Sequence, residues 1–136
     1  MSAPKGNQYY LIRSKNGREK KYTPEGLVEV ANEYFQWCID NPLMEEVIQK
    51  RKINRDEEVI EKYYLSKMRA FSIEGFCNYA QIVINTFKNY EESDDFLTVT
   101  TRIREIIDKQ QFEGAASGFL NANIIARKLG LADKQE

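Results

Sequence analysis

The spacing of apolar residues predicts a mainly helical chain, and the clearest helix covers residues 23–40. Thr23 and Pro24 suit its start, because threonine can cap free backbone amides and proline fits the first helical position. The Asn-Pro pair at 41–42 ends it, since the residue before a proline avoids helical angles. Apolar side chains recur every three or four positions in this helix and are predicted to be buried together: Leu27, Val30, Ala31, Tyr34, Phe35 and Cys38.

Two short helices are predicted in residues 72–90, the first of them capped by Ser72. The apolar face of the first helix is predicted to comprise Phe76, Cys77, Ala80 and Val83. Two short helices joined by a tight turn have the shape of a helix-turn-helix, whose second helix would cover about 85–90. That helix offers base edges only Asn85, Thr86, Lys88 and Asn89. A major-groove reader and a structural use of the same shape both stay open, with the structural use favoured.

A long helix is predicted from a cap at residues 93–95 to about Gly114. Its buried stripe is predicted to comprise Phe96, Val99, Ile103, Ile106, Ile107 and Gln110. Arg104 and Asp108 are four positions apart, so they could form an ion pair on the outer face.

Small residues at 114–118 would allow a close helix crossing or a subunit contact, because they let backbones approach one another. A last helix is predicted over about 121–129. Gly130 suits its C-terminal cap, and Leu131 would close the accompanying apolar contact.

Residues 44–66 admit two interpretations. Their many Glu, Lys and Gln residues permit a helix. Turn formers at 53–56, with β-branched and aromatic residues on either side, favour a β-hairpin instead. A two-stranded ribbon is marginal in isolation, so it would gain stability where copies from several subunits pair or pack side by side.

Composition predicts one soluble domain with an uneven charge distribution. The 136 residues are 42% hydrophobic and 30% charged, and no apolar run approaches the roughly 18 residues that span a membrane. Residues 1–22 carry six basic residues and one acid, a net charge of +5, whereas the remainder has a net charge of −6. The basic segment could be an arm that binds a phosphate backbone or an acidic partner, or a solvated tail.

The residues that usually carry catalysis are missing. The chain has no histidine, CxxC pair, Walker-type glycine loop or GxSxG elbow, so we expect neither enzymatic activity nor a metal or cofactor. Cys38 and Cys77 lie within apolar patterns and are expected to be reduced core cysteines of an intracellular protein.

Four short segments in fixed order carry a resemblance to a known family. They are SAPKGN at 2–7, EYFQW at 33–37 with NPL at 41–43, KMRAF at 67–71, and FEGAASGFLNANIIARKLGL at 112–131. Together they resemble the small terminase subunit of headful-packaging tailed phages over nearly the whole chain. The run LNANIIAR at 120–127 is the most specific match, and the hairpin region is the poorest, being longer and more charged here.

The resemblance implies a mainly α fold: a helical core at 23–132 with a protruding two-stranded antiparallel β-hairpin at about 44–66. A basic arm at 1–22 and a short tail at 133–136 would flank it. It also implies a non-enzymatic part of the genome-packaging motor, assembling into a ring of about eight to ten copies. Such rings recognise the packaging initiation site on double-stranded phage DNA. They also recruit and regulate the large terminase subunit, an ATPase and nuclease, in the cytoplasm of the infected bacterium.

Candidate site residues follow from the basic segments and from the resemblance. The first group of DNA contacts is Lys5, Arg13, Lys15, Arg18, Lys20 and Lys21. The second is Lys50, Arg51, Lys52 and Arg55 at the hairpin tip, whose charges could instead keep an exposed β-edge from aggregating. Candidate subunit contacts are Trp37, Tyr63, Tyr64, Asn121, Asn123 and Arg127. Trp37 could instead belong to the core, and the last three are interpreted first as structural, as helix caps and as hydrogen bonds between helices or subunits. The alternatives are a helix-turn-helix transcription regulator and an adaptor that binds only protein.

Overall fold

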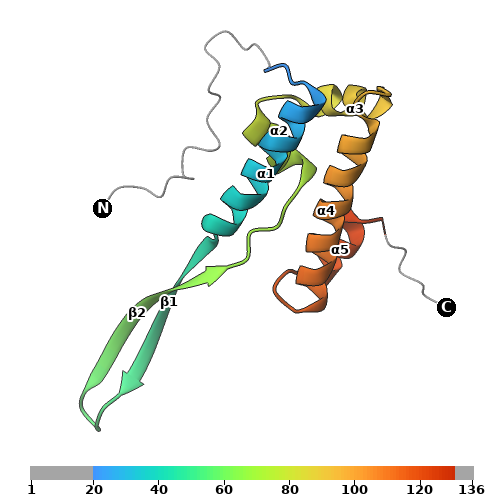
Figure 1. Cartoon of the computed structure of the whole chain (residues 1–136). Helices are drawn as coiled ribbons and strands as arrows, with labels where there is room; N and C mark the ends of the chain where they lie inside the picture. The colour runs from blue at the N-terminus through green and yellow to red at the C-terminus, as the bar shows by residue number, and fades with distance from the viewer. Residues whose placement is uncertain (1–19, 131–136) are drawn as a thin grey trace, which may run out of the picture.

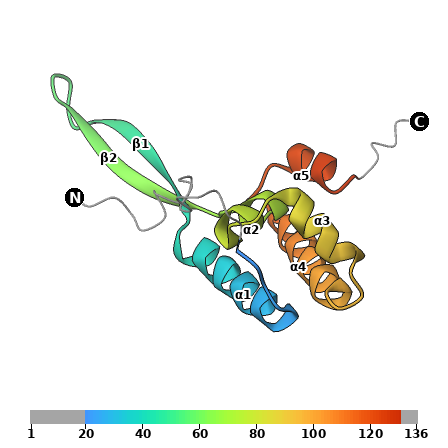
Figure 2. The same cartoon turned by 90° about the horizontal axis from the view of Figure 1, so that it is seen from above.

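The computed structural model describes residues 20–130, in which five helices form a body and a two-stranded hairpin projects from it (Figure 1). In chain order the elements are α1 (Pro24–Asp40), β1 (Leu43–Lys52), β2 (Glu58–Lys67), α2 (Ile73–Ala80), α3 (Ile84–Glu92), α4 (Leu97–Ala116) and α5 (Ala122–Lys128). The predicted helical fold with a protruding hairpin is therefore confirmed. Seen from above, α1 and α5 lie on opposite sides of the body, and each packs on α4 (Figure 2).

Local sequence defines α1 at both ends. The Thr23 hydroxyl accepts a hydrogen bond from the Gly26 amide at 3.0 Å, as predicted for an N-terminal cap. At the other end, the backbone and side-chain amides of Asn41 both donate to the Trp37 carbonyl at 2.9 Å. The predicted buried face is also confirmed, with each of Leu27, Val30, Ala31, Tyr34, Phe35 and Cys38 buried.

Tyr34 lies at the centre of the core and joins α1 to α2. Its ring packs against Phe71 and Phe76 with centroid distances of 6.2 and 6.0 Å. The Tyr34 hydroxyl accepts a hydrogen bond from the Ser72 amide at 3.1 Å, and the Ser72 hydroxyl caps α2 through the Gly75 amide at 3.0 Å. Only glycine fits at position 75, because a Cβ there would lie 2.4 Å from the Tyr34 hydroxyl oxygen.

The turn between α2 and α3 differs from the prediction at Val83. This residue is 55% exposed and precedes α3 as its N-cap, whereas the sequence pattern placed it on the apolar face of α2. The physical reason is Gln81, whose φ of 63° turns the chain before Val83 can reach that face. The rest of the predicted face is correct, with Phe76, Cys77 and Ala80 buried, and both cysteines of the chain are free and buried.

The long helix α4 begins at Leu97, later than the predicted cap at 93–95. Residues 93–96 form a turn in which the Phe96 amide donates to the Ser93 carbonyl at 3.1 Å. This turn lets the Phe96 ring stack on Tyr90 at a centroid distance of 4.3 Å, a tertiary contact that overrides the local capping signal. The buried side of α4 comprises Thr100, Ile103, Ile107, Gln111 and Gly114, whereas Phe96, Val99, Ile106 and Gln110 are half-buried.

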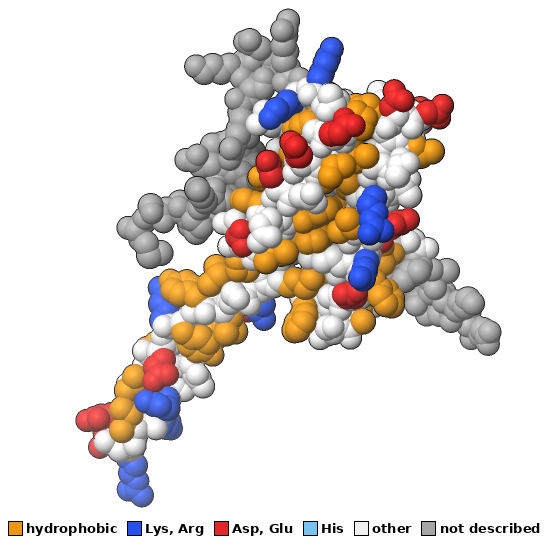
Figure 3. Space-filling model, in the orientation of Figure 1, with side chains coloured by type: hydrophobic (Ala, Val, Ile, Leu, Met, Phe, Trp, Pro, Cys, Tyr) orange, Lys and Arg blue, Asp and Glu red, His pale blue; other side chains and the backbone are white. Residues whose placement is uncertain are grey.

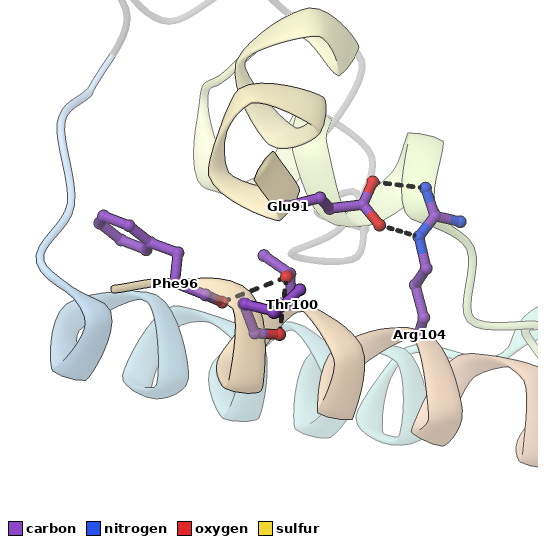
Figure 4. A network of polar contacts seen from close by, with 5 residues as sticks. Glu91, Phe96, Thr100 and Arg104 are labelled. Atoms are coloured by element: carbon purple, nitrogen blue, oxygen red, sulfur yellow. Dashed lines mark hydrogen bonds and ion pairs between the residues drawn. The ribbon is translucent and has the colours of Figure 1, made fainter. Parts of the chain in front are cut away.

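Arg104 pairs with Glu91 of α3, and the ion pair predicted with Asp108 is wrong. Its Nε and Nη2 lie 2.5 and 2.8 Å from the two carboxylate oxygens of Glu91 (Figure 4). A bidentate contact of this kind is stronger than a single exposed pair on one helix face. On the same helix, the Thr100 hydroxyl lies within hydrogen-bonding distance, 3.1 Å, of the backbone carbonyls of both Phe96 and Leu97 (Figure 4).

At the end of α4, the small-residue run at 114–118 makes a tight return of the chain. We predicted a close helix crossing or a subunit contact there, and one close approach occurs within the chain itself. A Cβ on Gly114 would lie 2.5 Å from Leu120 Cδ1, so the chain folds back directly onto the helix. Asn121 then caps α5 by accepting from the Ile124 amide at 3.1 Å, as expected. Gly130 has the positive φ, 70°, of the predicted C-terminal cap, and Leu131 lies outside the described residues.

The hairpin predicted at 44–66 is confirmed, with strands of ten residues each. Pairing is antiparallel, from Leu43 opposite Lys67 to Lys52 opposite Glu58. The side-chain carbonyl of Asn54 closes the turn, because it accepts hydrogen bonds from the backbone amides of Asp56 and Glu57 at 3.0 and 2.9 Å. Because nothing in the described body covers the ribbon, its side chains are mostly exposed (Figure 3).

Candidate nucleic-acid interface and subunit contacts

Of the predicted basic arm, Lys20 and Lys21 lie within the described part of the chain. Lys5, Arg13, Lys15 and Arg18 lie outside it. The Lys20 amide donates to the Gln81 carbonyl at 3.2 Å, and the neighbouring Tyr22 hydroxyl donates to the Ala80 carbonyl at 2.5 Å. These bonds hold the two lysines against the turn between α2 and α3.

Tyr22 keeps its proton well beyond neutral pH. Burial, with a smaller effect of Glu33, raises the pKa of Tyr22 to about 12. The hydroxyl therefore remains a donor to Ala80 under all ordinary conditions. The Tyr22 amide also donates to the Tyr90 hydroxyl at 3.4 Å, which ties the end of the arm to α3.

Residues 20–22 and α3 border an open pocket with a volume of about 950 Å³. It is lined by Lys20, Lys21, Tyr22, Thr86, Asn89, Tyr90 and Phe96. The lining thus combines two lysines and two polar residues with the aromatic rings of Tyr90 and Phe96, which stack on each other at a centroid distance of 4.3 Å. Cations next to aromatic faces suit the phosphates and bases of a nucleic acid.

Two polar residues of the predicted recognition helix, Thr86 and Asn89, thus face the same cavity as the arm lysines. The aromatic part of this lining was missed from sequence, because Phe96 was assigned to the buried stripe of the long helix and Tyr90 was not singled out as a candidate. Acidic residues at 91, 92, 94 and 95 follow directly in the chain, so the attraction for phosphate is confined to the lysine side.

The hairpin tip presents a second set of cations. Lys50, Arg51 and Lys52 end β1, and Arg55 lies in the turn. Arg51 pairs with Glu61 at 3.1 Å, whereas no ion pair among residues 20–130 involves the other three. Lys or Arg side chains occupy the far end of the ribbon (Figure 3). The tip can therefore reach an anionic partner at a distance from the body.

Tyr63 and Tyr64, predicted subunit contacts, lie on opposite faces of the ribbon and are 40% and 58% exposed. One face carries the apolar residues Leu43, Val47, Val59, Tyr63 and Leu65. The other carries Met44, Ile48, Ile60 and Tyr64. Diagonal ion pairs interrupt both faces, as between Lys62 and Glu46 at 3.0 Å. Each face thus carries four or five apolar side chains among charged ones, which gives the ribbon a partly apolar surface that could contact another protein.

The ribbon is fixed to the body at its root by Arg69. The guanidinium lies 4.7 Å from the ring centre of Trp37, and its Nε donates to the Asn41 carbonyl at 2.7 Å. Gln110 of α4 accepts from the Phe71 amide at 2.9 Å and donates to the Arg69 carbonyl at 3.2 Å. Trp37 is half-buried in this root, so within one protomer it orients the hairpin.

On α5, Asn121 serves as a cap, and Asn123 and Arg127 are exposed. Lys128 bonds Glu74 of α2 and holds the helix to the body. The hydrogen bond from Lys128 lowers the pKa of the Glu74 carboxyl. Within residues 20–130, no hydrogen bond or ion pair involves the side chains of Asn123 and Arg127.

Two searches of the described residues complete the inventory. No group of three or more His, Cys, Asp or Glu side chains within residues 20–130 could hold a metal ion. Within the same part of the chain, no helix combines the length and the apolar character needed to cross a membrane.

Comparison with known proteins places these surfaces in a packaging protein. The profile of a family described as "DNA-packaging protein gp3" matches residues 17–136, and the chain belongs to this family of phage DNA-packaging proteins. It is similar to the terminase small subunit of Salmonella phage P22, with 39% identity over 137 aligned positions. That alignment covers 100% of this chain and 82% of the relative. The resemblance to small terminase subunits is therefore confirmed.

Proposed function

We propose that this small terminase subunit works as a homo-oligomeric ring of about eight to ten copies. In the cytoplasm of the infected bacterium, the ring recognises phage DNA at the packaging initiation site and recruits and regulates the large ATPase and nuclease subunit. The observation that supports the proposal best is the hairpin, whose two faces carry exposed apolar side chains far from the core.

Such a ribbon favours self-association because it cannot bury these side chains by itself. Ile48 and Ile60 are diagonal neighbours on one face and are 61% and 63% exposed. Burying one such side chain fully contributes roughly 1.5–3 kcal/mol, so a neighbour that covers both would stabilise an assembly substantially. Because both faces need cover, each ribbon would contact a neighbour on either side, as in a closed ring.

DNA binding follows from repetition of a weak patch. Lys20 and Lys21 at the cavity and the cations of the tip give each subunit only a few phosphate contacts. In a ring, contacts from several subunits act at one effective concentration, which converts weak binding into useful avidity. The affinity should then fall steeply with salt, by a slope of about 0.9 for each phosphate neutralised.

Assembly is tested by native mass spectrometry of the full chain. Ile48→Ser with Ile60→Ser should lower the oligomer mass or raise the concentration needed for assembly. The matched control is Val83→Ser, which removes an apolar side chain that is 55% exposed on the body. A monomeric wild-type chain, or a ribbon variant that assembles like the control, would overturn the ring.

DNA binding is tested by fluorescence anisotropy with a duplex that contains the packaging initiation site, across a salt series. Lys20→Ala with Lys21→Ala should reduce the salt slope by roughly two for each engaged subunit. The matched control, Lys67→Ala with Lys109→Ala, removes two exposed lysines that do not line the cavity. Equal slopes in the two double variants would exclude the cavity as a DNA contact.

Recruitment of the large subunit is tested with the purified partner. The wild-type assembly should change its ATPase rate, and the ribbon variant should lose that effect together with the assembly. A large subunit that responds equally to both would show that the ring is not needed for regulation.

A further inference from the structure

The pocket beside α3 contains groups for which paired DNA offers no partner. Lys20 and Lys21 can bind phosphates whether or not the bases are paired. In a duplex, however, each base is paired with its complement and stacked between its neighbours. The side chains of Asn89, Tyr90 and Phe96, which line the same pocket, therefore find no free base face or pairing edge in a duplex.

The dimensions of the pocket fit one nucleotide. Its volume of about 950 Å³ lies near the upper end of the roughly 300–1,000 Å³ that is typical of sites for small ligands. A whole duplex is too wide to enter a space of this size, so its contacts would be limited to phosphates at the border. A nucleotide with an unpaired base could enter with both its phosphate and its base.

The charge of the lining favours an anion. Among the described residues that line the pocket, the charged ones are Lys20 and Lys21. Both are exposed, and no ion pair among residues 20–130 involves them. The acidic residues at 91, 92, 94 and 95 do not line the pocket. The two ammonium groups are therefore available to a phosphate.

The other side of the lining suits a base. The Asn89 side chain is exposed on α3 and makes no hydrogen bond within residues 20–130. Its amide offers a donor and an acceptor, which match the neighbouring acceptor and donor of an adenine edge. Tyr90 and Phe96 stack on each other and remain only half-buried, so part of each ring is open to a ligand. Aromatic side chains stack unpaired bases irrespective of sequence.

Hydrogen bonds within the protomer fix both borders of the pocket. The Lys20 amide donates to the Gln81 carbonyl at 3.2 Å, and the Tyr22 amide donates to the Tyr90 hydroxyl at 3.4 Å. The stack of Tyr90 on Phe96 then holds the aromatic part of the lining in place. A site whose walls are already positioned loses less entropy when a ligand binds.

We propose that this pocket binds a single nucleotide whose base is not paired. The phosphate lies beside Lys20 and Lys21. The base stacks on the rings of Tyr90 and Phe96, and its edge bonds the Asn89 amide. The inference rests on the proposed DNA contact of the two lysines and deepens it by naming the unit that enters the pocket. Two sources share this chemistry, a free nucleotide and a nucleotide of DNA that has lost its pairing partner.

Isothermal titration calorimetry of the full chain tests the free nucleotide, with ADP and pyrophosphate as probes. Both probes carry phosphate charge but only ADP has a base, so ADP should bind at least about fivefold more tightly. Asn89→Ala should reduce that advantage and leave the affinity for pyrophosphate unchanged, whereas Lys20→Ala with Lys21→Ala should weaken both. Asn32→Ala is the matched control, because Asn32 is an exposed asparagine of α1 that does not line the pocket.

Fluorescence anisotropy tests the DNA source with two duplexes that differ by one unpaired adenine. The duplex with the bulged adenine should bind at least about fivefold more tightly than the fully paired one, and Asn89→Ala should reduce the difference. A preference for ADP alone would assign the pocket to a free nucleotide. A preference for the bulged duplex alone would assign it to unpaired DNA.

The outcomes separate this site from DNA binding itself. The nucleotide site is overturned when neither ADP nor the bulged duplex binds more tightly than its partner probe, or when Asn89→Ala behaves like Asn32→Ala. The proposed DNA contact still stands in that case, provided that binding of the paired duplex weakens with salt and with loss of the two lysines. A wild-type chain that binds neither nucleotide nor duplex overturns both. Circular dichroism of each variant verifies that the helices persist.

Discussion

Substituting Gly75 with alanine should destabilise the fold, although alanine is normally the better helix residue. The new Cβ would lie 2.4 Å from the Tyr34 hydroxyl oxygen and 2.9 Å from the Ser72 hydroxyl oxygen, well inside contact distance. Tyr34 is 2% exposed and packed among aromatic rings, so it cannot swing away freely.

The magnitude follows from three contributions. Overpacking costs about 1–3 kcal/mol, losing the Tyr34–Ser72 hydrogen bond costs about 1 kcal/mol, and helix propensity returns about 1 kcal/mol. The net expectation is a loss of about 1–3 kcal/mol, or a melting temperature lower by roughly 4–12 °C. Urea denaturation and thermal melts followed by circular dichroism measure both quantities, at one fixed protein concentration because assembly contributes to stability.

A double-mutant cycle identifies the cause. Tyr34→Phe alone should destabilise, because it leaves the Ser72 amide without its partner. Combined with Gly75→Ala it should cost less than the sum, by about 1 kcal/mol or more, since the clashing oxygen is gone. Gly26→Ala is the control, because a Cβ there would lie 3.2 Å from Thr23 Oγ1, a close contact but a less severe one than the 2.4 Å at position 75. Additive effects of the two substitutions would refute the reasoning.

Two further expectations concern the hairpin root and α5. Replacing Arg69 with alanine should leave the helical body folded but raise hydrogen exchange at the Asn41 and Phe71 ends of the ribbon, because the stacking on Trp37 and the bond to Asn41 are lost. Unchanged exchange would mean that the two hydrogen bonds of Gln110 suffice to fix the root. Lys128 lowers the pKa of Glu74, so their contact should stabilise α5 above the ordinary carboxyl pKa and be lost as pH falls through the lowered value. Hydrogen exchange of α5 amides should therefore rise in that acidic range for the wild type, and a Lys128→Gln variant should show the faster exchange already at neutral pH. Equal protection in the two proteins at pH 7 would disprove a role for this bond.

The predictable parts of the fold are those that depend on residues three or four positions apart. Thr23, Ser72 and Asn121 each cap a helix through the amide three residues later. These caps involve only neighbouring residues, so the helix starts could be predicted without knowing the tertiary contacts. The hairpin was ambiguous from composition alone; the turn formers at 53–56 and the β-branched and aromatic residues beside them favoured it over a helix, and the family resemblance supported that choice.

The errors lie where distant segments compete with local signals. The cap expected at 93–95 gave way because Phe96 stacks on Tyr90. Arg104 pairs with Glu91, thirteen positions away in the sequence, and not with Asp108 on its own helix. In the candidate site, the lysines could be found one by one, but their cavity is closed by a contact between Tyr22 and Tyr90, 68 positions apart.

The orientation of the hairpin at its root determines the position of its tip. A ten-residue strand extends about 34 Å, so a rotation of about 10° at its base displaces the tip by about 6 Å. Arg69, with the backbone groups it joins, therefore sets where the cations of the tip are found in space. A change of length or charge in the outer half of the ribbon should leave the body undisturbed, whereas a change at the root would move the whole tip and every cation it carries.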